Sequence, residues 1–161
     1  MSVTSVDKDP EALTMTVTAD LDATVERAWQ LWADPRQFER WWGPPGYPAT
    51  VVDHDLTPGG RVNYFMTGPE GDKHAGYWQI TSVDEPRSIS FVDGFADLDF
   101  NPNPAMPVST NVYTFAEHDG GTRAVFVSSY ESAEALQQVL DMGIVEGASL
   151  AINQIDDLVA A

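Results

Sequence analysis

The chain has 161 residues, of which 43% are hydrophobic, and its 25 acidic against 8 basic side chains give a formal net charge of −17. This length suits one domain, which we expect to span residues 1–161 with a core over about 13–158. The acidic excess repels polyphosphates, which excludes nucleic acid from the expected partners. No apolar run approaches the roughly 20 residues of a membrane-spanning helix. Because cysteine and a secretory signal pattern are also absent, we expect a cytoplasmic protein without a membrane span.

The first predicted elements are a strand and two short helices. From Leu13, LTMTVTAD alternates apolar and polar side chains, so we expect an edge or hairpin strand that buries one face. Thr24 is a candidate N-cap for a short amphipathic helix. Asp34 followed by Pro35 then starts a second helix. The Gly-Pro-Pro-Gly corner at 43–46 ends it.

After residue 47 the chain is rich in short alternating segments separated by turns, which predicts an antiparallel meander. The expected strands are ATVVDHDL (49–56), RVNYFMTG (61–68), HAGYWQITSVD (74–84), SISFVDG (88–94), VSTNVYTFAE (108–117) and TRAVFVSSY (122–130). A loop punctuated by proline covers 94–107. From Glu131 one long helix is predicted almost to the end of the chain. Its buried stripe is expected to hold Leu136, Leu140, Gly143, Gly147, Leu150 or Ala151, Gln154 and Leu158.

This order of elements predicts an α+β fold. A curved antiparallel sheet of about seven strands surrounds a long C-terminal helix, and two short helices follow the first strand. A sheet of this size twists and curls, and a long helix is the natural cover for its apolar concave face. We expect such packing to leave space between the helix and the sheet.

The sequence contains no convincing motif for a metal or a cofactor. The three histidines lie on different segments without a metal-binding spacing. Residues 97–108 carry Asp and Asn side chains at the first positions that bind calcium in a calcium-binding loop. However, Pro102 stands where such a loop needs a glycine for its turn, and Val108 stands where it needs a final glutamate. Phosphate-binding and dinucleotide motifs do not occur. We therefore expect no metal and no cofactor and assign no catalytic residue; the Asp-rich stretch that begins at Asp93 is interpreted as turns.

Aromatic side chains are the strongest signal in the chain. In WWGPPGY (41–47), Trp42 occupies the last turn of a short helix beside a rigid corner. We expect Trp42 to line a cavity entrance and Trp41 to anchor the corner. In the final helix, Gly143 and Gly147 each cost about 1 kcal/mol in helix propensity relative to alanine. Either a close approach of helix to sheet or room for a bound molecule would offset that cost.

Five segments resemble bacterial homologues of the activator of heat-shock-protein-90 ATPase, in the START-like or SRPBCC superfamily. The segments are WADP (32–35), WWGPPGY (41–47), DLTPGGRVNYFMTGPEG (55–71), GYWQITSVDEPR (76–87) and GGTRAVF (120–126). The resemblance runs from about Leu13 to Leu158 and implies the helix-grip fold. Family members often carry Gly-Trp in the final helix, whereas Gly147 precedes Ala148 here, which implies a pocket with smaller walls at its inner end.

The superfamily typically holds small hydrophobic molecules between helix and sheet, and some relatives are polyketide cyclases. The eukaryotic namesake stimulates a chaperone, but it carries an additional N-terminal domain for which this chain has no room, so we do not expect that activity to transfer.

We therefore expect non-enzymatic binding of a small hydrophobic molecule, a lipid or a polyketide-like compound, in a cavity between the sheet and the C-terminal helix. The expected ligand-binding residues are Trp42, Tyr64, Met66, Trp78, Phe95, Tyr113, Met142 and Leu150. Two alternatives stay open. One is a cyclase/aromatase-like enzyme in which a Tyr, Asp or His donates a proton. The other is a chaperone-associated or regulatory interaction protein, linked to the stress response, that uses the acidic surface. A homodimer also stays open.

Overall fold

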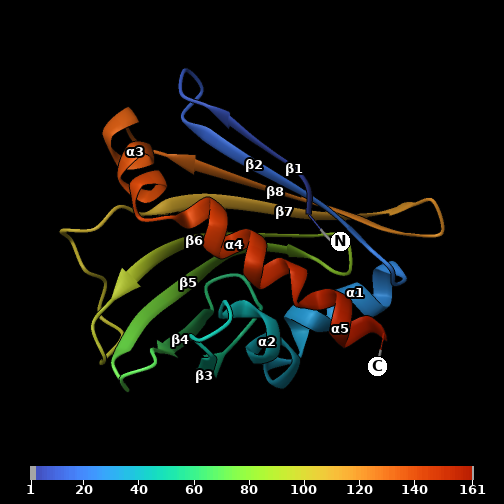
Figure 1. Ribbon diagram of the computed structural model, residues 1–161, viewed down its shortest axis with the longest axis horizontal. Helices are drawn as coiled ribbons and strands as arrows, with labels where there is room; N and C mark the ends of the chain where they lie inside the picture. Colours follow the sequence, from blue (N-terminus) through green and yellow to red (C-terminus); the bar gives the residue numbers. More distant parts are fainter. Residues whose placement is uncertain (1–2, 161) are drawn as a thin grey trace.

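Eight strands form one antiparallel sheet in the computed structural model, which describes residues 3–160 (Figure 1). They are β1 (Val3–Asp9), β2 (Thr14–Leu21), β3 (Ala49–His54), β4 (Arg61–Thr67), β5 (Lys73–Asp84), β6 (Ser88–Ala96), β7 (Ser109–His118) and β8 (Gly121–Tyr130). Their order across the sheet is β1-β2-β8-β7-β6-β5-β4-β3. The predicted α+β class, with its curved sheet and two short helices after the first predicted strand, is confirmed. Residues 1, 2 and 161 of the predicted domain lie outside the described residues.

All seven predicted strands are present, and β1 precedes them as an eighth. It pairs with β2 as a hairpin that places Val6 opposite Val17. Because β8 pairs with the other side of β2, β2 is a hairpin strand and not an edge strand, the first of the two predicted alternatives being wrong. Among the side chains of β1, Val3 and Val6 alone are partly buried. Because these two residues are three apart, β1 lacks the two-residue alternation by which a strand is predicted from sequence.

The two short helices begin and end where the sequence predicts. In α1 (Val25–Ala33), the Thr24 side chain accepts a hydrogen bond from the backbone N–H three residues on, at 3.1 Å. In α2 (Pro35–Trp42), the Asp34 carboxylate accepts one from the backbone N–H two residues on, at 2.9 Å. At the end of α2, a Cβ added to Gly43 would lie 2.0 Å from the Tyr47 carbonyl oxygen. Only glycine therefore fits this corner.

The C-terminal region differs from the single long helix that the sequence predicts. It forms α3 (Ala133–Asp141), α4 (Ile144–Asn153) and α5 (Ile155–Ala160). Gly143 separates α3 from α4 with a φ of +82°, in the left-handed region that glycine adopts without steric cost. As a result α3 packs at the end of β8, and α4 lies across the sheet (Figure 1).

Aromatic rings fill the core between α1, α2 and the concave face of the sheet. The Trp32 ring centroid lies 4.7 Å from those of Trp41 and Phe115 and 5.8 Å from that of Phe126. This packing occupies one end of the concave face, and α4 covers the rest. Between residues 3 and 160, no helix is long and apolar enough to cross a membrane.

Candidate functional site

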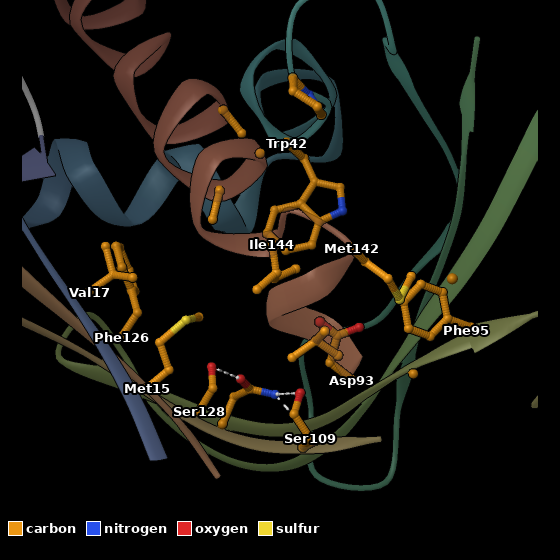
Figure 2. A pocket seen from close by; sticks show the side chains of 18 of the residues that line it. Met15, Val17, Trp42, Asp93, Phe95, Ser109, Phe126, Ser128, Met142 and Ile144 are labelled. Carbon is orange, nitrogen blue, oxygen red and sulfur yellow. Dashed lines mark hydrogen bonds between the residues drawn. The ribbon is translucent and has the colours of Figure 1, made fainter. Parts of the chain in front are cut away.

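A cavity of about 340 Å³ lies between α4 and the concave face of the sheet. Its walls come from β2, from β4 to β8, from the end of α2 and from α3 and α4. Most of the lining is apolar or aromatic, as Figure 2 shows for Met15, Val17, Phe126 and Ile144. The helix and the sheet thus enclose a hollow of the size at which protein pockets hold small organic molecules, roughly 300–1,000 Å³.

The face of α4 that lines the cavity consists largely of small residues, which leave space beside the helix. Gly147, Ala148 and Ala151 all line the cavity. A Cβ added at Gly147 would meet no heavy atom within 4 Å, so this glycine does not serve a close approach of helix to sheet. Of the two explanations for the glycines, room for a bound molecule fits Gly147, whereas Gly143 serves the turn between α3 and α4.

The structure places most of the predicted ligand-binding residues around this one cavity. Those that line it are Trp42, Tyr64, Met66, Phe95, Tyr113 and Met142. Trp78 does not, because it is fully buried and its ring stacks on Phe91 with centroids 3.9 Å apart. Leu150 does not either: it is 53% exposed, and Ala151 holds the position on α4 that faces the cavity, one turn after Gly147.

The two tryptophans of WWGPPGY occupy different environments. Trp41 borders the cavity but is buried, and its indole N–H donates a hydrogen bond to the Leu31 carbonyl at 2.9 Å. Trp42 is half-buried and lines the cavity (Figure 2). Its ring meets the Tyr64 ring edge to face, with centroids 5.7 Å apart. The side chain of Gln154 donates hydrogen bonds to the carbonyls of Trp41 and Gly43 at 3.1 and 2.7 Å, which ties the C-terminal end of α4 to this corner.

A small polar network forms the floor of the cavity. Ser128 donates to the Asn111 side-chain oxygen at 2.6 Å, and the Asn111 amide donates to the Ser109 hydroxyl at 3.0 Å (Figure 2). Asn111 is 2% exposed. These hydrogen bonds link the three side chains to one another across β7 and β8.

Asp93 is the one acidic side chain among the described residues that line the cavity. It is half-buried, and its carboxylate points into the cavity (Figure 2). No hydrogen bond or ion pair with a described residue involves this carboxylate. Burial raises the pKa of Asp93 from 3.8 to about 7. A carboxyl group that titrates near neutrality can hold a proton, release it or accept a hydrogen bond from a bound molecule.

Asp93 lies within β6, as the predicted strand over 88–94 implies, so its interpretation as a turn residue is wrong. Strand alternation locates this side chain. Every second residue of a strand points to the same face, so Asp93 shares its face with the buried Ile89 and Phe91. Phe95, on the same face, lines the cavity. The expected turn begins later, at Asp97, whose carboxylate accepts backbone hydrogen bonds at 2.9 and 3.0 Å. Within residues 3–160, no group of three or more His, Cys, Asp or Glu side chains is placed to hold a metal ion.

A curved antiparallel sheet that holds an apolar cavity against a C-terminal helix defines a START-like domain of the helix-grip type, a small-ligand-binding fold. Residues 22–160 match the family described as Activator of Hsp90 ATPase homolog 1-like protein. The chain belongs to this family. A search of curated proteins finds no significant match.

Solved structures of other bacterial proteins share this fold. A crystal structure of a protein from Mycobacterium smegmatis is 71% identical, covers 97% of this chain and 96% of its own, and has a TM-score of 0.91. A solution structure of a protein from Arthrobacter aurescens is 45% identical over 96% of this chain and 90% of its own, with a TM-score of 0.92. The family protein from Silicibacter pomeroyi, 21% identical over 91% of this chain and 97% of its own, shares the fold with a TM-score of 0.72.

Proposed function

We propose that this protein binds a small hydrophobic molecule, such as a lipid or a polyketide-like compound, in the cavity under α4 without converting it. The observation that carries the proposal is the cavity itself, about 340 Å³ with mostly apolar walls. A ligand gains about 25 cal/mol for each Å² of apolar surface that it buries there, which after the costs of association supports dissociation constants of about 1 μM.

The polar groups of the cavity support binding in preference to catalysis. Ser109, Asn111 and Ser128 are hydrogen-bonded to one another. No described side chain forms a hydrogen bond with the Asp93 carboxylate. A nucleophile paired with a base, the usual arrangement for covalent catalysis, is therefore absent from the described lining.

One observation favours a second candidate, a cyclase-like enzyme. Burial brings the pKa of Asp93 to about 7, which is the range in which a single carboxyl group acts well as a general acid or base. Native mass spectrometry of the purified protein separates the two candidates. A co-purified molecule whose mass stays constant during incubation supports binding alone, and conversion of that molecule supports the enzyme.

A titration with Nile red tests the binding proposal. The variant Ala148→Trp places an indole in the cavity, since Ala148 lines it, and we expect this variant to lose saturable binding of the dye. Leu150→Trp is the matched control, because the same indole is then added to an exposed position of the same helix. We expect this control to bind as the wild type does. Equal titration curves for both variants, or no saturable binding by the wild type, would refute the proposal.

A further inference from the structure

The cavity carries one charged group that the fold leaves without a partner. Asp93 projects from β6 on the concave side, between the buried Phe91 and the cavity residue Phe95. Within residues 3–160, neither lysine nor arginine lines the cavity. A carboxylate in such a wall loses the solvation it has in water, and the surrounding residues supply no positive charge in return.

The other titratable groups near Asp93 do not supply that charge. Tyr64 from β4, Tyr113 from β7 and Tyr130 from β8 line the same cavity, and phenols are neutral at physiological pH. His74 from β5 also lines it, but its Nε2 pairs with Asp72, and the His74 side chain is 60% exposed. Ser109, from the polar network on the floor, lies opposite Asp93 in the sheet, but no side-chain hydrogen bond joins these two described residues.

We propose that the ligand is an amphiphilic amine, a hydrophobic molecule with one basic nitrogen, whose ammonium group pairs with the Asp93 carboxylate while its apolar part fills the cavity. This inference rests on the proposed function and names the ligand class for the same site. An ammonium group restores the interactions that the carboxylate loses on burial, and charge-assisted hydrogen bonds are among the strongest in proteins. The rise in the pKa of Asp93 to about 7 agrees with a carboxyl group that lacks such a partner in the free protein.

The net charge of the whole protein also favours a cationic ligand. A formal net charge of −17 attracts cations and repels anions at long range. A fatty acid would bring a second carboxylate next to Asp93. Two negative charges in contact within an apolar wall repel each other strongly. A fatty alcohol avoids that repulsion but contributes a neutral hydrogen bond only. The expected order of affinity is therefore amine, then alcohol, then carboxylate.

Three ligands with the same alkyl chain test this order: decylamine, decanol and decanoate, each used to displace Nile red at pH 8. We expect decylamine to bind the wild type about 10- to 100-fold more tightly than decanol, the range that a hydrogen bond to a charged group provides. In Asp93→Asn, which keeps the shape of the side chain and removes its charge, this preference should disappear while the affinity for decanol is kept. Asp99→Asn is the control, because it removes the same charge from the exposed loop after β6, outside the cavity lining; it should keep the preference for the amine.

The outcomes separate this inference from the function on which it rests. Equal binding of the three ligands, or a preference for decanoate, overturns the amine inference and leaves hydrophobic binding in place. A preference for decylamine that survives in Asp93→Asn overturns the role of Asp93. No binding of any of the three ligands or of Nile red removes both proposals. If Asp93→Asn fails to fold by circular dichroism, Asp93→Ser and the ligand order of the wild type provide the same test.

Discussion

Replacing Asp93 with asparagine should stabilise the ligand-free protein at alkaline pH and leave it unchanged at acidic pH. Burial raises the pKa of Asp93 in the folded state to about 7, from 3.8. A carboxyl group with a raised pKa favours folding most when it is protonated. The wild type therefore loses this contribution as pH rises from the unfolded-state value through about 7, whereas the variant has no group there to ionise.

The size of the effect follows from the shift. At about 1.36 kcal/mol for each pKa unit, a rise from 3.8 to about 7 corresponds to an upper limit of about 4 kcal/mol. Water admitted to the cavity screens part of this penalty, so we expect Asp93→Asn to raise the free energy of unfolding by about 1–3 kcal/mol at pH 8. The gain should be close to zero near pH 4, grow as pH approaches 7, and level off above about pH 8.

Urea denaturation followed by tryptophan fluorescence, repeated across this pH range, measures the effect. Asp97→Asn is the matched control, since it removes the same charge from the exposed loop after β6. Backbone hydrogen bonds, chiefly from Asn101, lower the pKa of Asp97, so this substitution should lower the free energy of unfolding at neutral pH. A pH-independent difference between wild type and Asp93→Asn, or the same sign for both variants, would refute the reasoning.

Four further substitutions test the walls of the cavity. Trp41→Ala should lower the free energy of unfolding by about 3–5 kcal/mol, while Trp42→Ala should cost less and weaken Nile red binding; equal losses of stability with unchanged binding would contradict this division. Gly76→Ala would place a Cβ 2.5 Å from the Tyr64 hydroxyl, so thermal unfolding should show a loss of about 1–3 kcal/mol. Gly147→Ala, with open space around the new methyl group, should instead stabilise the protein by about 1 kcal/mol; destabilisation would show that the glycine serves packing.

The strands were predictable because their side chains alternate in burial. β2 and β8 alternate along most of their length, and each predicted strand lies close to its observed bounds. The exceptions have local causes. β1 buries few side chains, so its pairing with β2 is not visible in the sequence. The break between α3 and α4 depends on the φ of Gly143, and a glycine inside a helical pattern is compatible with either a continuous helix or a turn.

The site was predictable to the extent that the alternation of side chains along strands and the helical repeat determine which residues face the cavity. Strand alternation places Tyr64, Phe95 and Tyr113 on the concave face, and all three line the cavity. Leu150 was misplaced because a helical stripe is wide enough to include either Leu150 or its neighbour. The missing partner of Asp93 could not be predicted, because pairing is a property of the assembled sheet, where strands distant in sequence supply the surrounding side chains.

The location of a bound ligand tests the central claim most directly. Methyl signals in a two-dimensional ¹H–¹³C NMR spectrum, recorded while decanol is added, report where it binds. We predict saturable shifts for the cavity residues Val17 and Ile144 and no shifts for Val52 and Val112, which are 52% and 42% exposed. Shifts confined to the exposed valines, or unchanged spectra at saturating decanol, would contradict a ligand site between α4 and the sheet.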